Sequence, residues 1–233
     1  MEKKTIGIIG GMGPLATCDL FEKIIRHTRV SCDQEHLHVL IDNNPAVPDR
    51  TKALLHGGES PLPALCASAR RLEADGAQVL LLPCNTSHHY YAELSAAVSV
   101  PLLHMIALTR DALLRKGVSC AGLLATDGTL QTGVYQDAFA GSGVTLLPPE
   151  AAEQAAVMDT IYRGVKADDP AYTPAALSEA CRSLLARGAQ VLILGCTELP
   201  IAFDRWQLPF PVVDPTLELA LAAIRFAGGS VKE

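Results

Sequence analysis

The chain has 233 residues, a formal net charge of −6, 49% hydrophobic residues and 19% charged residues. This composition is typical of a compact soluble protein with one or two sizeable cores. The basic residues are scattered, which argues against a nucleic-acid partner or an anionic membrane surface, and no stretch predicts a membrane span.

The first half alternates predicted strands with predicted helices. A β-branched apolar run is followed by a glycine turn and then by a helical pattern with a proline in its first turn. A polar, proline-rich loop follows the second strand, and Gly76 ends the next long helix. We expect strands over 5–10, 36–41, 79–82 and 101–103, and helices over 14–29 and 62–75.

The second half repeats this order. Its predicted strands cover 121–125, 144–147, 191–194 and 211–213, and its helices cover 151–165 and 174–186. The strand before each cysteine is apolar throughout, as expected for a strand that is buried on both faces. Strands that alternate with helices predict a parallel α/β architecture.

One segment of the sequence occurs twice. Residues 76–84 read Gly-Ala-Gln-Val-Leu-Leu-Leu-Pro-Cys, and residues 188–196 read Gly-Ala-Gln-Val-Leu-Ile-Leu-Gly-Cys. The preceding helix and the start of each half also match, which indicates a duplication. We therefore expect two similar parallel-sheet α/β domains related by a pseudo-twofold axis, with the active site in the cleft between them. The N-terminal domain would cover 1–102 and carry a C-terminal helix from 214–233, and the C-terminal domain would cover 103–213.

Both copies of the repeat end on a cysteine. Cys84 and Cys196 each follow a buried strand, and functional loops of parallel sheets gather at such carboxyl ends. Inversion of a carbon stereocentre by proton transfer needs a base on one face and an acid on the other. Two thiols can exchange these roles, and a position beside a helix N-terminus can lower the pKa of a thiol. The pair predicts two-base proton transfer.

Further candidate residues, most of them polar, lie at the carboxyl ends of the predicted strands. Small hydroxyl and amide side chains there can cradle a carboxylate, and an arginine can hold a second carboxylate through two hydrogen bonds. The candidates for substrate binding are Met12, Arg50, Thr51, Asn85, Thr86, Thr126, Thr129, Thr197 and Glu198.

The short motifs around these residues resemble one known family over nearly the whole chain. They are Gly10-Gly11-Met12-Gly13-Pro14, Asn43-Asn44-Pro45, Pro48-Asp49-Arg50-Thr51, Pro83-Cys84-Asn85-Thr86 followed by His88, and Gly195-Cys196-Thr197-Glu198-Leu199. Together, and in this order, they resemble the aspartate/glutamate racemase family and specifically its aspartate racemase branch.

The resemblance implies a homodimeric racemase without cofactor or metal that interconverts L- and D-aspartate, with glutamate left open as a further substrate. It implies that Cys84 faces the D isomer and Cys196 the L isomer. It assigns the α-carboxylate to Asn85, Thr86 and Thr197, and the side-chain carboxylate to Arg50 and Lys166. Where many relatives have alanine, this chain has Ser87, which we expect to alter the wall of the pocket rather than the chemistry.

The remaining cysteines and histidines have simpler interpretations. Cys18, Cys66, Cys120 and Cys181 lie in helical or strand patterns and are predicted to belong to the core, whereas Cys32 is a loop thiol. His36 and His38 share one face of a predicted strand, but no third ligand has a defined place, so no metal site is predicted.

Other functions fit parts of the sequence. Gly11-x-Gly13-x-x-Ala16 with Asp42 matches a loose dinucleotide-binding pattern and would suit an NAD-dependent oxidoreductase. Pro14, however, removes an amide donor where pyrophosphate would bind. A non-catalytic small-acid binding protein would leave both thiols unused. Hydantoin racemase and maleate isomerase remain alternatives within the superfamily.

Cysteine usage bears on the cellular compartment. The seven cysteines form no closely spaced pair, and the apolar run before Gly10 is too short for a signal-peptide core. We expect free thiols in a reducing cytoplasm.

Overall fold

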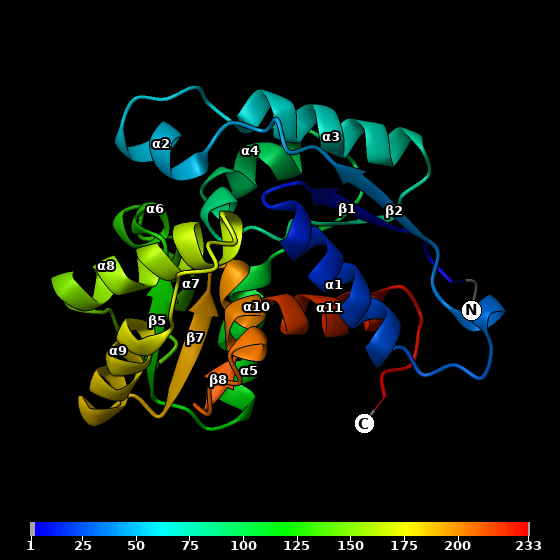
Figure 1. The fold of residues 1–233 in the computed structure, drawn as a ribbon. Helices are drawn as coiled ribbons and strands as arrows, with labels where there is room; N and C mark the ends of the chain where they lie inside the picture. The colour runs from blue at the N-terminus through cyan, green and yellow to red at the C-terminus, as the bar shows by residue number, and fades with distance from the viewer. Residues whose placement is uncertain (1–2, 233) are drawn as a thin grey trace. The chain divides into compact units, whose positions relative to one another are not determined.

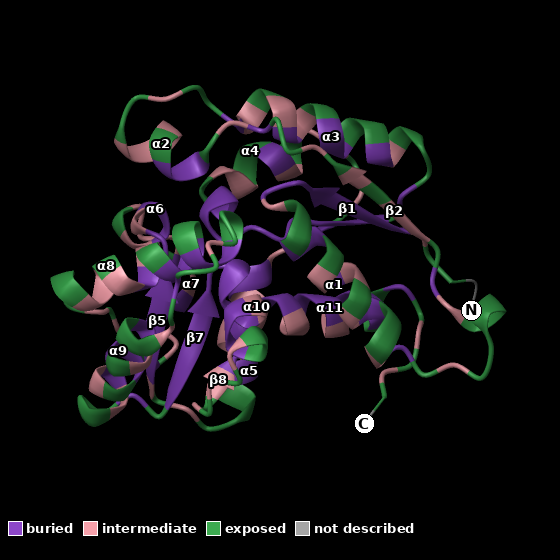
Figure 2. Ribbon diagram, viewed as in Figure 1, coloured by how far each residue is buried: buried purple, intermediate pink, exposed green. Residues whose placement is uncertain are grey.

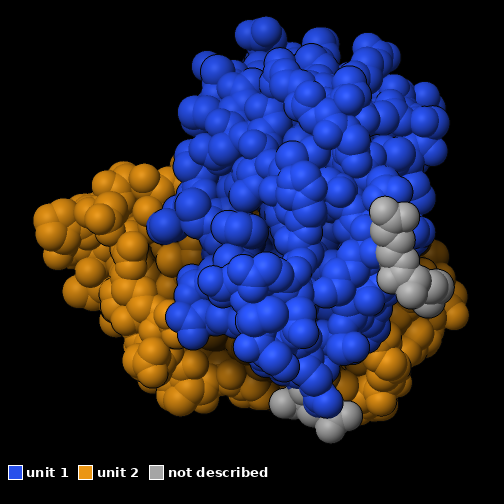
Figure 3. Space-filling view, turned by 90° about the vertical axis from the view of Figure 1, so that its right-hand side faces the viewer, with its two compact units in different colours: residues 1–105, 216–233 blue, residues 106–215 orange. Residues whose placement is uncertain are grey.

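The computed structural model describes residues 3–232, and the chain divides into two compact units (Figure 3). Unit 1 comprises Met1–Met105 and Thr216–Glu233, and unit 2 comprises Ile106–Pro215. Unit 1 is therefore built from two separate stretches of the chain, whereas unit 2 is continuous.

Unit 1 contains a four-stranded parallel sheet in the order β2-β1-β3-β4, and Figure 1 labels β1 and β2. Helix α5 starts at Met105, the last residue of the first stretch of unit 1, and continues into unit 2. The elements of unit 1 are β1 (Ile6–Gly10), α1 (Pro14–His27), η1 (Asp33–Glu35), β2 (Val39–Asn43), α2 (Arg50–Leu55), α3 (Leu62–Ala74), β3 (Val79–Leu81), η2 (Thr86–Tyr90), α4 (Tyr91–Ala96), β4 (Leu102–Leu103) and α11 (Pro215–Phe226).

Unit 2 contains a second parallel sheet with the equivalent order β6-β5-β7-β8. Its elements are α5 (Met105–Arg115), β5 (Cys120–Ala125), α6 (Asp127–Gln131), α7 (Val134–Phe139), β6 (Thr145–Leu147), α8 (Ala151–Asp159), the π-helix η3 (Thr160–Lys166), α9 (Ala175–Ala186), β7 (Val191–Gly195), α10 (Glu198–Arg205) and β8 (Val212–Val213). The predicted fold class, two similar parallel α/β sheets with flanking helices, is confirmed.

Helices cover both faces of each sheet, so the central strands are buried (Figure 2). In unit 2, one face of β5 and β7 packs on α8, η3, α9 and α10, and the other face packs on α5 and α7. In unit 1, α3 and α4 pack on the face that carries Ile9 and Leu80. This two-sided burial explains why the strand before each cysteine has no polar residue.

The duplication is visible in the packing as well as in the sequence. A Cβ atom added to Gly7 on β1 would lie 2.7 Å from the side chain of Leu80 and 3.3 Å from that of Leu72. A Cβ atom added to Gly122 on β5 would lie 2.8 Å from Leu192 and 3.3 Å from Leu184, the matching residues of the repeat. Glycine in the central strand therefore allows close packing in both units: α3 and β3 approach β1, and α9 and β7 approach β5.

Three predictions about local structure were wrong. The second strand begins at Val39, so His36 and His38 precede it. The helix expected over 151–165 is divided into α8 and the π-helix η3. Cys18 is exposed rather than in the core, because the buried face of α1 consists of Ala16, Thr17, Leu20 and Ile24.

Cys181 is buried as predicted, and all seven cysteines are free thiols. Among the described helices, none combines the length and the apolar character that crossing a membrane requires.

Candidate active site

The predicted site residues of unit 1 lie at the carboxyl ends of its parallel strands, which share one edge of the sheet. Met12 follows β1, Arg50 and Thr51 begin α2 after β2, and Cys84 follows β3. All of these side chains are buried, as are the adjacent Asn85 and Thr86. Burial of polar side chains costs free energy unless they have hydrogen-bond partners, so their concentration at this edge of the sheet indicates a functional site.

Arg50 joins two loops of this edge. Its guanidinium donates to the carbonyl oxygens of Val47 and Pro48 at 3.3 and 3.0 Å, and to that of Met12 at 3.3 Å. The Arg50 side chain thus fixes the loop after β2 against the loop after β1. This backbone role was not anticipated from the sequence, which predicted only carboxylate binding.

The segment that carries Cys84 contacts the same loop. Ser87 is fully buried, and its hydroxyl donates to the sulfur of Met12 at 3.6 Å. The sequence motif places Asn85 and Thr86 next to Cys84, and η2 begins at Thr86. The three strand ends of unit 1 therefore form one connected group of residues.

The predicted residues of unit 2 also gather at the carboxyl edge of their sheet. The hydroxyl of Thr126 caps α6 by accepting a hydrogen bond from the backbone N–H of Thr129, and the two threonine hydroxyls lie 3.0 Å apart. Cys196, Thr197 and Glu198 follow β7 and are buried. Lys166 is the last residue of the π-helix η3, not of a loop after a strand, and its side chain contacts Glu198.

Cys196, Glu198 and Lys166 form a chain of polar contacts. The thiol of Cys196 donates to Oε2 of Glu198 at 2.9 Å, and Nζ of Lys166 forms an ion pair with Oε1 of the same carboxylate at 2.9 Å. The hydroxyl of Thr197 also donates to Oε2, at 3.4 Å. The carboxylate of Glu198 is thus engaged by a thiol, a hydroxyl and an ammonium group.

This environment keeps Cys196 protonated. Burial, and then the negative charge of Glu198, raise the pKa of the Cys196 thiol well above its usual range, and Lys166 opposes this only in part. Tyr135 is fully buried, and its pKa is raised well above the usual range by burial and then by the charges of Cys196 and Asp214. Its phenol therefore remains neutral. No sequence pattern pointed to Tyr135.

The π-helix that ends at Lys166 is held by close packing around a glycine. A Cβ atom on Gly164 would lie 2.9 Å from the ring of Tyr172 and 3.0 Å from that of Trp206. Tyr172 in turn exchanges a hydrogen bond with Thr160 at the start of the π-helix. π-Helical turns occur frequently at functional sites, and this one determines the position of Lys166 beside Glu198.

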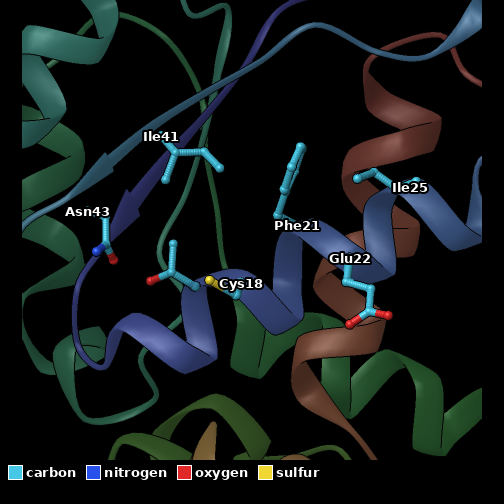
Figure 4. A pocket seen from close by; sticks show the side chains of 7 residues that line it. Cys18, Phe21, Glu22, Ile25, Ile41 and Asn43 are labelled. Carbon is cyan, nitrogen blue, oxygen red and sulfur yellow. The ribbon is translucent and has the colours of Figure 1, made fainter. Parts of the chain in front are cut away.

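A separate pocket of about 360 Å³ lies in unit 1 between α1 and β2 (Figure 4). Its lining consists of Thr17, Cys18, Phe21, Glu22, Ile25, Ile41 and Asn43. None of these residues belongs to the predicted site, and the lining is mostly apolar. Within residues 3–232, no group of three or more His, Cys, Asp or Glu side chains is arranged to hold a metal ion.

Comparison with known proteins gives a consistent result. The family described as Asp/Glu/Hydantoin racemase matches residues 9–223. The broad-specificity amino-acid racemase RacX of Bacillus subtilis is 28% identical over 223 residues, covering 94% of this chain and 96% of the relative. The structure of an aspartate racemase from Picrophilus torridus superposes with a TM-score of 0.89 at 31% identity, over 98% of this chain and 96% of that one. Glutamate racemase from Bacillus anthracis, at 18% identity and a TM-score of 0.68, shares the fold over 97% of this chain and 82% of that one.

Proposed function

Because this chain belongs to the Asp/Glu/hydantoin racemase family, we propose that it is a cofactor-independent amino-acid racemase that interconverts L- and D-aspartate. The observation that carries the proposal is the matched position of two buried cysteines, each in the loop that follows a central strand of its own sheet. Free thiols at these positions are suited to proton transfer at a carbon centre.

The proposed reaction uses one thiol as a base and the other as an acid. A thiolate removes the proton from the α-carbon on one face, and the second thiol donates its own proton to the opposite face. The product then has inverted configuration, and the two sulfur atoms have exchanged protonation states. This mechanism requires Cys84 and Cys196 to lie on opposite faces of the bound substrate; following the resemblance, we assign Cys84 to the D isomer and Cys196 to the L isomer.

We further propose that Glu198 handles the proton of Cys196 rather than binding the substrate. The contact of 2.9 Å between the thiol and the carboxylate supplies an acceptor for the thiol proton when Cys196 must act as a base. Lys166 forms an ion pair with the same carboxylate at 2.9 Å. A carboxylate in this place would repel an anionic substrate group, which favours the proton-transfer role over the binding role predicted from the sequence.

We propose that the remaining polar residues at the carboxyl ends of the strands bind the substrate. Asn85, Thr86 and Thr197 would hold the α-carboxylate, while Arg50 and Lys166 would attract the side-chain carboxylate of aspartate or glutamate. The Arg50 guanidinium donates three hydrogen bonds to backbone carbonyl oxygens, which hold the side chain in one orientation before a ligand binds.

Exchange of the α-hydrogen in deuterated water tests this proposal. The purified protein is incubated with each enantiomer of aspartate, glutamate and alanine, and with a 5-substituted hydantoin, and deuterium incorporation and optical rotation are followed. We expect racemisation of aspartate by the wild type and its loss in both Cys84→Ser and Cys196→Ser, with each variant still exchanging one enantiomer. Full racemisation by either variant would exclude the two-thiol mechanism, and activity on the hydantoin alone would transfer the assignment to hydantoin racemase.

We also propose that the enzyme acts as a homodimer in the cytoplasm. The proposal is supported by the resemblance to aspartate racemases and by the free cysteines, which suit a reducing compartment. Light scattering coupled to size-exclusion chromatography measures the mass in solution, and a mass equal to one chain would contradict the dimer.

A further inference from the structure

His88 connects two backbone groups that are far apart in sequence. The backbone N–H of Met105 donates to Nε2 of His88 at 3.1 Å, and Nδ1 of the same ring lies 2.9 Å from the carbonyl oxygen of Cys84. Both the imidazole and the Met105 side chain are buried. One side chain thus links the residue that carries the thiol to the last residue of unit 1 before the chain enters unit 2.

These two contacts determine the protonation state of the ring. The amide of Met105 can only donate, so Nε2 must be an unprotonated acceptor. A neutral imidazole then carries its hydrogen on Nδ1, where it donates to the Cys84 carbonyl. Burial and then the neighbouring His104 lower the pKa of His88 to about 3, which agrees with a neutral ring.

Aromatic neighbours hold the ring in this orientation. The ring of Tyr91 stacks on that of His88 with 6.0 Å between centroids, and the ring of His104 lies 4.9 Å away. Tyr91 is fixed in turn by its hydroxyl, which donates to the carbonyl of Leu102 at 2.8 Å. The imidazole therefore has little freedom to turn away from either backbone partner.

We propose that His88 is a positioning residue for Cys84, holding the backbone of the thiol-bearing residue at a fixed distance from the start of α5. The proposal rests on the proposed function, because it assumes that Cys84 transfers a proton at the α-carbon. His88 does not contact the reacting atoms in this role. Its effect is to fix the direction of the thiol, and small errors in such a direction slow a reaction steeply.

Two substitutions separate the two contacts. The amide of His88→Asn can replace Nδ1 and still donate to the Cys84 carbonyl, but it cannot reach the amide of Met105. The amide oxygen of His88→Gln can replace Nε2 as an acceptor but leaves the Cys84 carbonyl without its donor. His89→Gln is the matched control, since His89 is the next residue of the same η2 turn and is exposed.

The decisive measurement is the ratio of two exchange rates. Cys84→Ser first identifies the enantiomer whose α-hydrogen exchange depends on Cys84. We expect His88→Gln to reduce this exchange by roughly 10- to 100-fold, while exchange through Cys196 and the rates of His89→Gln stay near wild type. We expect His88→Asn to reduce it less. A role confined to folding would lower the melting temperature and leave the ratio unchanged, which would overturn the proposal.

A second readout needs no substrate. Alkylation of Cys84 by iodoacetamide is followed by mass spectrometry of its peptide, with Cys196 as the internal reference. We expect His88→Gln to change the rate at Cys84 alone. If the wild type exchanges no substrate, the proposed function fails, and the alkylation rates still decide whether His88 positions Cys84. Equal Cys84 rates in His88→Gln, His89→Gln and wild type would refute the proposal.

Discussion

The thiol of Cys196 donates a hydrogen bond to a carboxylate oxygen of Glu198 across 2.9 Å, and the same carboxylate is paired with Lys166. A thiolate at this position would stand beside a negative charge, so the thiol form is favoured at rest. In the proposed mechanism, Glu198 therefore controls both how readily Cys196 loses its proton and where that proton goes.

Replacement of Glu198 by glutamine should therefore have two opposite effects. Removal of the negative charge lowers the pKa of the Cys196 thiol, so its alkylation at neutral pH should become faster. Loss of the proton acceptor should reduce kcat for racemisation by about 10²-fold, the lower end of general acid–base contributions. Glu179→Gln, which alters an exposed glutamate, is the control. Faster alkylation with unchanged kcat would show that Glu198 takes no part in proton transfer.

Substitution of Arg50 should discriminate between substrates. We expect Arg50→Ala to lower kcat/KM for aspartate and glutamate by roughly 2–4 kcal/mol in activation free energy, with little effect on alanine, and Arg50→Lys to fall between because lysine cannot make two parallel hydrogen bonds. Arg70→Lys serves as the control, since Arg70 is an exposed arginine that also donates to a backbone carbonyl. An equal loss for all three amino acids would mean that Arg50 serves only the loops that it joins.

The buried neutral His88 should make the protein sensitive to acid. Its pKa is lowered from 6.5 to about 3 in the folded state, so the unfolded chain binds one more proton between these values. The contribution of His88 to the free energy of unfolding is fully present above pH 6.5. It falls by about 1.4 kcal/mol per pH unit as the pH decreases toward 3. Urea unfolding between pH 4 and 8 measures the free energy of unfolding, which should decrease less steeply with falling pH in His88→Gln than in wild type. An identical pH dependence in the two proteins would contradict a neutral buried ring.

The equivalent glycines of the two sheets, Gly7 and Gly122, predict similar losses of stability on substitution. Gly7→Ala and Gly122→Ala each place a methyl group under 3 Å from a neighbouring leucine, so each should destabilise its unit by about 1–3 kcal/mol. Denaturant unfolding measures both. A cost near zero in either variant would show that the helix and strand can separate without loss.

The repeated strand and its terminal cysteine were sufficient to predict the two sheets and the local placement of Cys84 and Cys196. Strand alternation and position relative to strand ends are local properties, and the sequence expresses them directly. The contacts of His88 were not predictable in this way, because one partner is a backbone amide seventeen residues later. The burial of Tyr135 and the exposure of Cys18 likewise depend on how helices turn against the sheets.

The sequence did predict Lys166 and Glu198 as site residues, but not their pairing. The pairing depends on the π-helix, whose wider turn changes the direction in which Lys166 points compared with a regular α-helix. A helical pattern in sequence does not reveal such a turn.

Unit 1 includes α11, which follows unit 2 in the chain and has fully buried Leu219, Ala223 and Ile224. On the ribosome, the continuous unit 2 is therefore complete before unit 1 has all of its core. The core of unit 1 lacks these side chains of α11 during this interval, when a nascent chain is most prone to aggregate or to bind a chaperone. The order of synthesis thus makes the half that bears Cys84 the later one to mature, although it is translated first.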